Sequence, residues 1–157
     1  MINSVMSLLP INTVIQTRAE PVLTYQHEIV PYLKESNAYG NIYFSRYFEW
    51  QGMCREMWFC ECIFPNMFEI KGALVTKFAH NDYEQELFPF QKIICLLNSA
   101  NVRRTSFELM FRFYSRDTNQ LVARGTQKIG LVDTNSKRPI KIPTEILEKI
   151  RRYAMNK

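Results

Sequence analysis

The residues best suited to chemistry lie in and just after the turn-rich segment 36–41. Asn37 carries an amide, which donates and accepts hydrogen bonds but has no ionisable group. It can therefore hold a carbonyl or a water molecule, and it cannot act as a base. Tyr43 can donate a hydrogen bond to the same region. The backbone N–H groups of Asn41 and Ile42 open a predicted helix, whose positive end can stabilise the oxyanion formed when water attacks a carbonyl.

A cation lies about three turns further along the same predicted helix. The guanidinium of Arg55 can pair with a carboxylate or stabilise an enolate, because it keeps its charge and presents several donors in a fixed geometry. These residues also have structural interpretations. An asparagine in a turn usually bonds its own backbone, and a helical arginine usually pairs with nearby acids, here Glu49 or Glu56. The residues alone leave both interpretations open.

A second candidate binding site is the segment 101–106, between two predicted strands. Arg103 and Arg104 can bind phosphate oxygens in a bidentate manner, and Thr105 adds a hydroxyl group. A charged hairpin turn is an equally good interpretation. The formal net charge of +5 fits either an anionic partner or a solvated basic surface, and no nucleic-acid-binding motif accompanies it.

Neither a metal centre nor a disulfide framework is expected. The four cysteines form no C-x-x-C pair, and the two histidines are far from them in sequence, which disfavours a zinc site. We expect free thiols in a reducing cytoplasm. The chain shows neither a signal-peptide pattern nor an apolar run of about 20 residues that could span a bilayer. The cysteines are Cys54, Cys60, Cys62 and Cys95.

The 157 residues are enough for one folded domain. Residues 1–21 show no sustained period and are interpreted as an N-terminal arm. Residues 22–157 are interpreted as the domain itself. Alternation from Val22 to Lys34 predicts its first strand, and Pro31 indicates an edge or a bend near the end of that strand.

The strongest helix signal runs from Ile42 to about Cys62, with Asn41 as its N-cap. Gly52 interrupts the helix at a cost of about 1 kcal/mol relative to Ala. This cost suggests that another backbone packs closely there. Apolar residues recur at spacings of three and four and form a wide stripe. They are Tyr43, Tyr47, Trp50, Cys54, Met57 and Trp58.

Four strand-like runs and a short helix, Thr144 to Ala154, complete the chain. One long striped helix and a five-stranded antiparallel sheet each have a single face to bury, so they must cover each other. The sequence therefore predicts an α+β fold with one long central helix. The strand-like runs are Ala73–Tyr83, Gln91–Asn101, Thr105–Ser115 and Leu121–Asp133.

The loop N-A-Y-G-N-I-Y-F at 37–44, followed by W-Q-G-M-C-R-E at 50–56, resembles the signature region of the 4-hydroxybenzoyl-CoA thioesterase family. It is most similar to the subgroup that releases enediyne polyketide precursors. The resemblance covers residues 22–145 and implies the hot-dog fold, a five-stranded sheet wrapped around the helix. Typical family members carry Asp where Asn37 stands and often His where Phe44 stands. The enediyne subgroup has Asn at the first position.

The resemblance implies a thioesterase that releases a β-ketoacyl polyene from an acyl carrier protein in polyketide biosynthesis, with or without decarboxylation. A general acyl-CoA thioesterase and a non-catalytic acyl-CoA-binding module are the alternatives. The resemblance also implies a cytoplasmic homotetramer with active sites between subunits. No cofactor is expected beyond the CoA or phosphopantetheine of the substrate. The implied site residues are Asn37, Arg55 and Tyr43 for catalysis, Asn41 and Ile42 for the oxyanion, and Arg103, Arg104 and Thr105 for the carrier phosphate.

Overall fold

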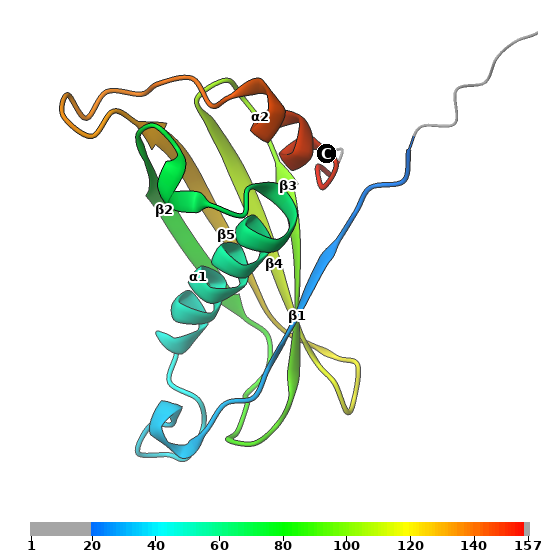
Figure 1. Ribbon diagram of the computed structural model, residues 1–157. Helices are drawn as coiled ribbons and strands as arrows, with labels where there is room; N and C mark the ends of the chain where they lie inside the picture. Colours follow the sequence, from blue (N-terminus) through cyan, green and yellow to red (C-terminus); the bar gives the residue numbers. More distant parts are fainter. Residues whose placement is uncertain (1–19, 156–157) are drawn as a thin grey trace, which may run out of the picture.

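A five-stranded antiparallel sheet wraps around one long helix (Figure 1). The computed structural model describes residues 20–155, so most of the predicted arm, 1–21, lies outside the described residues. The strand order is β1-β3-β4-β5-β2, and all neighbours are antiparallel. This is the hot-dog fold, as predicted. The elements are β1 (Tyr25–Ile29), α1 (Arg46–Trp58), β2 (Ala73–Tyr83), β3 (Ile93–Ala100), β4 (Ser106–Ser115), β5 (Leu121–Val132) and α2 (Thr144–Arg151).

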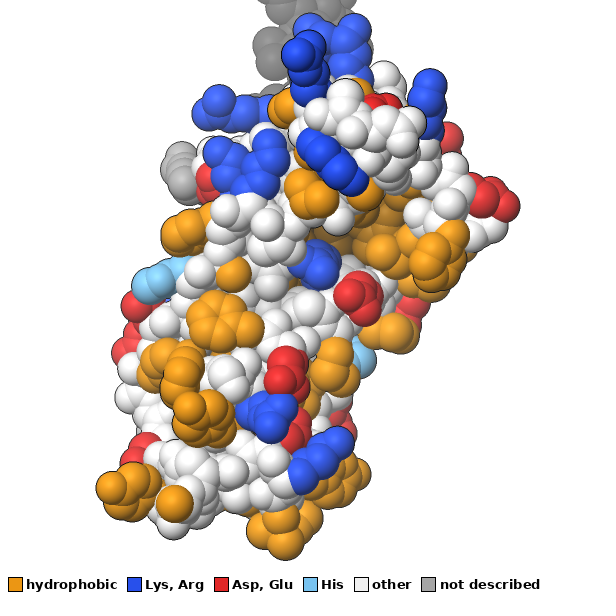
Figure 2. All heavy atoms as spheres, turned by 90° about the vertical axis from the view of Figure 1, so that its left-hand side faces the viewer, with side chains coloured by type: hydrophobic (Ala, Val, Ile, Leu, Met, Phe, Trp, Pro, Cys, Tyr) orange, Lys and Arg blue, Asp and Glu red, His pale blue; other side chains and the backbone are white. Residues whose placement is uncertain are grey.

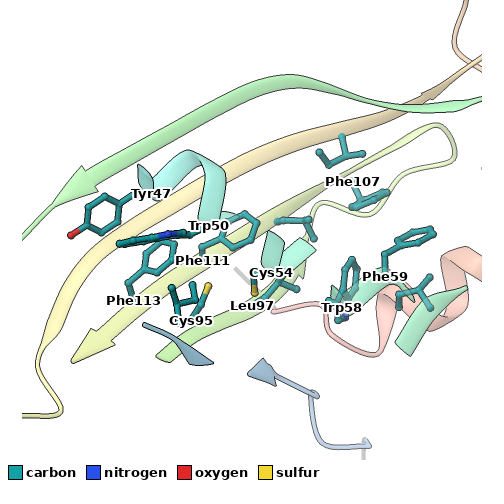
Figure 3. Packing of buried hydrophobic residues seen from close by; sticks show 14 of the residues in the cluster. Tyr47, Trp50, Cys54, Trp58, Phe59, Cys95, Leu97, Phe107, Phe111 and Phe113 are labelled. Atoms are coloured by element: carbon teal, nitrogen blue, oxygen red, sulfur yellow. The ribbon is translucent and has the colours of Figure 1, made fainter. Parts of the chain in front are cut away.

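The core lies between α1 and the concave face of the sheet (Figure 3). Alternate residues of β4 point to this face, and they meet the stripe of α1. Fully burying one such large apolar side chain contributes about 1.5–3 kcal/mol, so this contact holds the helix against the sheet. The helix side chains are Tyr47, Trp50, Cys54 and Trp58, and those of β4 are Phe107, Leu109, Phe111 and Phe113.

Helix α1 begins later than the sequence predicts, and Asn41 is not its N-cap. The helix starts at Arg46 and has Ser45 as its N-cap residue. The residues before it are mostly turns and bends, and within them Ser36 and Ile42 form an isolated antiparallel bridge. The N–H groups of Ile42 and Tyr43 donate to the carbonyls of Leu87 and Glu35, and these bonds outweigh the local preference for helix.

The helix ends in a widened turn. After Trp58 the chain continues as a π-helical turn, Phe59–Ile63, in which the N–H of Phe64 donates to the carbonyl of Phe59 at 2.8 Å. Phe59 and Ile63 are buried in this turn. Together the two segments cover residues 46–63, close to the predicted end of the helix at Cys62.

Gly52 is not in close contact with another backbone. No atom outside its own helix lies within 4 Å of the position that a Cβ would occupy, so the predicted close approach is wrong within the protomer. The stripe is also narrower than predicted. Tyr43 is 44% exposed because it precedes the helix, and Met57 is 41% exposed on its outer side.

The first strand and the last helix of the domain are shorter than predicted. Strand β1 covers Tyr25–Ile29 instead of 22–34, because Pro31 interrupts the alternation and Leu33–Glu35 forms a 3-10 turn. Helix α2 stops at Arg151. The N–H of Leu23 donates to the carbonyl of Arg152 at 2.9 Å, so the two ends lie side by side.

Strand β2 forms a long edge of the sheet. Ten of its 11 residues pair with β5, and no other described strand pairs with its outer side. The register shifts between Thr76 and Phe78, and the side chain of Phe78 is 54% exposed. An unpaired edge of this length is a template for pairing with another chain.

Candidate active site

A cavity of about 380 Å³ lies where the loop before α1 meets the segment after β2. Asn37, Asn41, Ile42 and Tyr43 all line it, so the fold brings together the residues predicted in this loop. The opposite wall comes from a part of the chain that the sequence analysis did not single out. The remaining lining residues are Phe44, Tyr47, Tyr83, Glu84, Gln85, Glu86 and Leu87.

Asn37 stabilises the turn with one end of its amide. Its Oδ1 accepts the backbone N–H of Tyr39 at 2.8 Å, and its backbone N–H donates to the carbonyl of Asn41 at 2.9 Å. Gly40 takes the positive φ of 87° that this turn requires. The Nδ2 group of Asn37 makes no hydrogen bond within residues 20–155 and remains available as a donor at the cavity. The interpretation that Asn37 bonds the backbone of its own turn is therefore correct for its side-chain oxygen.

The backbone N–H groups of Ile42 and Tyr43 are already engaged. The first donates to the carbonyl of Leu87 at 2.7 Å and the second to the carbonyl of Glu35 at 2.9 Å. This contradicts the predicted oxyanion role of Ile42, since its N–H points to another carbonyl. The N–H of Asn41 makes no hydrogen bond within residues 20–155, although it does not open a helix.

The actual start of α1 offers other donors. Within residues 20–155, the backbone N–H groups of Phe44 and Ser45 make no hydrogen bond, and they precede the positive end of the helix dipole. The hydroxyl of Tyr83 donates to the carbonyl of Phe44 at 2.8 Å and holds this segment in place. Burial raises the pKa of Tyr83, which keeps the hydroxyl protonated as a donor.

Two carboxylates of this cavity, Glu84 and Glu86, were not predicted as site residues from the sequence. Glu86 Oε1 accepts a hydrogen bond from Asn41 Nδ2 at 3.1 Å, and Glu84 Oε1 lies 3.4 Å from an Nη of Arg124. Both side chains are exposed. In sequence they belong to a short acidic segment after a strand, which is typical of a solvated loop. Only the tertiary fold brings them beside Asn37.

Arg55 is held at the inner side of the sheet by neutral acceptors. Its Nη1 donates to Thr76 Oγ1 at 2.8 Å and to Gln127 Oε1 at 2.9 Å. Its Nη2 lies 3.6 Å from Glu56 Oε1, and Glu49 pairs elsewhere. The side chain of Arg55 is 25% exposed. The salt-bridge interpretation is thus correct only for the longer contact with Glu56.

Arg55 lines a small cavity of about 150 Å³ between α1 and the sheet. A neighbouring hollow of about 480 Å³ shares Glu56, Met67 and Leu74 with it. The walls are mainly apolar, and the cation of Arg55 and the carboxylate of Glu56 are their charged groups. Such a space suits an acyl chain that carries a polar or anionic group. The apolar residues of the small cavity are Phe59, Met67, Leu74, Phe107 and Ile129.

Within one protomer, Asn37 and Arg55 do not share a cavity. The first lies in the loop before α1 and the second near the other end of this helix. At 1.5 Å per residue, Arg46 and Arg55 are about 14 Å apart along the axis. The structure therefore brings together the loop residues but not the predicted pair.

The predicted phosphate-binding turn is accessible. Arg103 and Arg104 are exposed, and within residues 20–155 their guanidinium groups form no ion pair. The carbonyl of Arg104 accepts the N–H of Ile142 at 2.8 Å, and that of Thr105 accepts the N–H of Leu131 at 3.0 Å. These bonds tie the turn to the end of β5 and to the segment between β5 and α2.

The basic groups that are scattered in the sequence gather at one end of the molecule. The turn after β3, the segment after β5 and helix α2 are neighbours at this end. Figure 2 shows lysine and arginine side chains concentrated there. We call this surface the basic end. Its residues are Arg103, Arg104, Lys137, Arg138, Lys141, Lys149, Arg151 and Arg152.

The family follows from the sequence itself. Residues 32–150, more than half of the chain, match the family model described as the thioesterase-like superfamily. The chain belongs to this superfamily. Its membership and its fold support thioesterase activity, the hydrolysis of an acyl thioester. A comparison with curated proteins finds no match.

Solved structures agree with this superfamily membership. The dynemicin thioesterase, whose crystal structures revealed induced-fit and allosteric effects upon polyene binding, has a TM-score of 0.76 and 25% identity, covering 85% of this chain and 99% of that one. A 1,4-dihydroxy-2-naphthoyl-CoA thioesterase from Synechocystis has a TM-score of 0.74 and 17% identity, with 81% and 95% covered. The second likeness concerns the fold alone.

A third similar structure is a 4-hydroxybenzoyl-CoA thioesterase variant in complex with 4-hydroxybenzoyl-CoA. It has a TM-score of 0.72 and 14% identity, covering 81% of this superfamily member and 98% of that chain. This likeness also concerns the fold alone. Between residues 20 and 155, no helix of the superfamily member is long and apolar enough to cross a membrane.

Proposed function

We propose that this superfamily member hydrolyses the thioester of a β-ketoacyl polyene carried by an acyl carrier protein. The observation that carries the proposal is the placement of Arg55, a cation held by neutral acceptors beside an apolar cavity. An apolar chain with an anionic head would fill that cavity and pair with the guanidinium. The likeness to the dynemicin thioesterase supports a polyene as the chain.

Water is the nucleophile in this proposal. Its oxygen attacks the carbonyl carbon, and the resulting oxyanion is held by Asn37 Nδ2, by Tyr43 and by the backbone donors before α1. Collapse of this intermediate breaks the C–S bond, and the thiolate leaves. We assign Glu86 as the group that accepts the proton of water and returns it to the thiolate. No covalent enzyme intermediate forms.

Arg55 first positions the β-ketoacyl group for hydrolysis and then acts on the acid that is released. Its guanidinium pairs with the carboxylate of the β-keto acid. If the acid then loses CO₂, the C–C bond breaks and its electron pair forms an enolate, which the same cation stabilises. A proton from water completes the methyl ketone. Thiol release and CO₂ release can be measured separately, so hydrolysis and decarboxylation are separate outcomes.

A dimer would bring Asn37 and Arg55 into one site. The exposed edge of β2 can pair with the β2 of a second copy about a twofold axis, and such a pair is antiparallel. The two α1 helices would then lie side by side in opposite directions. The loop before one α1 would approach the Arg55 end of the other. We therefore propose composite sites between protomers, in a dimer that can assemble further into a tetramer.

The basic end is the proposed surface for the carrier. Acyl carriers bring a phosphate on the arm that bears the thioester, and Arg103, Arg104 and Thr105 suit a phosphate group. The other cations of the basic end would attract an acidic carrier protein. Charge reversal at Arg103 and Arg104 should therefore raise KM far more than it lowers kcat. An unchanged KM would remove this part of the proposal.

The decisive experiment is thiol release from a β-ketoacyl carrier thioester and from plain acyl-CoA esters. We expect the wild type to prefer the β-keto substrate, and Asn37→Ala and Arg55→Ala to lose activity while remaining folded. Glu86→Gln should also lose activity, whereas Glu84→Gln is the matched control, because Glu84 lines the same cavity but pairs with Arg124. Equal effects of the two glutamine variants would remove the role of Glu86.

A second function remains open because Asn37 replaces the acidic group of typical members. If no thioester is cleaved while acyl-CoA still binds, the protein is a non-catalytic acyl-binding module and the mechanism is wrong. If plain acyl-CoA esters are cleaved as fast as the β-keto substrate, it is a general acyl-CoA thioesterase. Calorimetric binding of a long-chain acyl-CoA, measured beside the activity, separates these cases.

A further inference from the structure

Gln51 is a wholly buried polar residue of the W-Q-G-M-C-R-E run, and the proposed mechanism does not use it. It lies four residues before Arg55 on α1, so the two side chains are on the same face of the helix. A buried amide is costly unless its donors and acceptor are bonded. The partners of Gln51 therefore indicate what it does.

Gln51 belongs to a continuous chain of hydrogen bonds that ends at Arg55. Arg55 Nη1 donates to Gln127 Oε1 at 2.9 Å, and Gln127 Nε2 donates to Gln51 Oε1 at 3.1 Å. Gln51 Nε2 donates to Asn81 Oδ1 at 3.0 Å and to the carbonyl of His80 at 3.2 Å. The chain thus connects the helix with β5 and then with the edge strand β2.

All hydrogen bonds of this network have the same donor-to-acceptor direction, away from Arg55. Each glutamine accepts on the side of Arg55 and donates on the far side, so a flip of either amide would place two N–H groups against each other. Gln127 is 4% exposed and Asn81 is 8% exposed, which keeps competing water away. The backbone carbonyl of His80 cannot flip without breaking the strand. It therefore fixes the orientation of every amide up to the guanidinium.

A glycine leaves room for the side-chain amide of Gln51 in this hydrogen-bond network. Gly125 lies opposite Asn81 in the β2–β5 register. A Cβ at Gly125 would lie 2.1 Å from Gln51 Nε2 and 3.1 Å from Asn81 Oδ1. Any side chain there would expel the amide of Gln51. The absence of a side chain at position 125 and the polar residue at position 51 thus fit each other, although 74 residues separate them in sequence.

We propose that Gln127, Gln51 and Asn81 are positioning residues that hold the guanidinium of Arg55 toward the small apolar cavity of about 150 Å³ that it lines. This inference rests on the proposed function of Arg55. The acceptors of the chain are neutral, so they fix the guanidinium without cancelling its charge. A carboxylate in place of Gln127 would fix the group equally well but would oppose its charge. The hydrogen-bonded network therefore orders the guanidinium without adding a negative charge, and the longer contact with the exposed Glu56, 3.6 Å from Nη2, compensates its charge only in part.

The first test measures the order of Arg55 without any substrate. In protein labelled with ¹⁵N and ¹³C in arginine, the Nη groups of Arg55 should give separate, slowly exchanging signals, assigned by their loss in Arg55→Lys. Gln127→Leu should merge these signals, and Gln127→Glu should retain them because its oxygen still accepts from Nη1. Signals that stay separate in Gln127→Leu would overturn the proposal.

The second test is a double-mutant cycle in kcat. Gln127→Leu should lower kcat by about 10²-fold with little change in KM, because a displaced group fails in the transition state. In an Arg55→Ala background the same change should have almost no further effect, since the residue acts through Arg55. Equal losses in both backgrounds would show an independent role and would contradict the proposal.

A matched control separates positioning from stability. Asn98 is another buried amide, 1% exposed, which bonds to the carbonyl of Leu23 and to Thr24 Oγ1 and has no contact with the chain of Gln51. Asn98→Ala should lower stability and leave the Arg55 signals separate. If the wild type cleaves no thioester, the proposed function fails, but the signals of Arg55 still decide whether the chain holds its guanidinium.

Discussion

Asn37 uses the two ends of its amide differently. The oxygen accepts the N–H of Tyr39 and stabilises the turn, and the nitrogen remains free at the cavity. An aspartate would keep the first function and lose the second. The residue therefore changes the chemistry of the loop without changing its shape, which agrees with a mechanism that needs a donor at this position.

Asn37→Asp should separate the two functions. The variant should unfold at the same denaturant concentration as the wild type, because its carboxylate still accepts the N–H of Tyr39. Its kcat for thioester hydrolysis should fall about 10²-fold or more, since one donor to the oxyanion is lost. Urea titrations and steady-state kinetics on the same preparations test both parts. Retained activity would assign the oxyanion to Tyr43 and the backbone donors without Asn37.

Tyr153 should make the protein less stable at alkaline pH. Burial, followed by a hydrogen bond with Cys62, raises the pKa of Tyr153 to about 12, and its ring packs edge-on against Trp58 at 5.5 Å. The ordinary pKa is about 10, so the folded state binds the proton more tightly. This stabilisation is complete below pH 10 and is lost as the pH rises toward 12.

Tyr153→Phe should reduce that loss. Urea unfolding at pH 8 and at pH 11 should show a smaller decrease in stability for the variant than for the wild type. Tyr39→Phe is the control, because Tyr39 is 93% exposed and contacts no part of the core. Equal decreases for all three proteins would contradict the prediction.

At the scale of the elements, local periodicity predicted the helix and the strands whose formation depends on burying one face. The stripe of α1 and the alternation in β4 are properties of short windows, and both elements are where the sequence indicates them. The start of α1 was not predictable in this way, because carbonyls of Leu87 and Glu35 engage the segment before it. Glu86 was not predicted as a site residue for the same reason, because its place beside Asn37 depends on how a distant loop folds.

Two glycines should respond in opposite ways to alanine. Gly52→Ala should stabilise the protein by about 0.5–1 kcal/mol, because a Cβ meets no atom there and the helix prefers alanine. Gly72→Ala should destabilise it by more than about 1 kcal/mol, since φ is 103° and a Cβ would lie 2.6 Å from the carbonyl oxygen of Val132. Denaturant unfolding measures both. A destabilising Gly52→Ala would indicate that another subunit packs on α1.

At the scale of the whole molecule, the two groups of predicted catalytic residues are at opposite ends of one helix. A second copy paired through β2 would bring them together, and both basic ends would remain free for carriers. The protein should therefore sediment at a multiple of its 18.6 kDa chain mass. Phe78→Glu, on the exposed edge, should shift it toward the monomer and abolish activity.

Mixed dimers test the composite site directly. Asn37→Ala and Arg55→Ala should each keep only a small residual kcat, but a hybrid of the two has one site with both native residues. Coexpression with random pairing should restore about a quarter of wild-type activity. Each variant expressed alone is the control. Activity no higher than in these controls would place both residues in the same protomer's site.

The π-helical turn 59–63 bears on how this chain can vary in length. Such a turn holds one residue more than an α-helical path between the same neighbours. Losing a residue there can be absorbed by tightening the turn. A loss within 46–54 would rotate all later side chains of the helix by about 100° and carry Arg55 away from Gln127. Evolutionary insertions and deletions in the long helix should therefore collect between Phe59 and Ile63, after Phe59, which lines the small cavity beside Arg55.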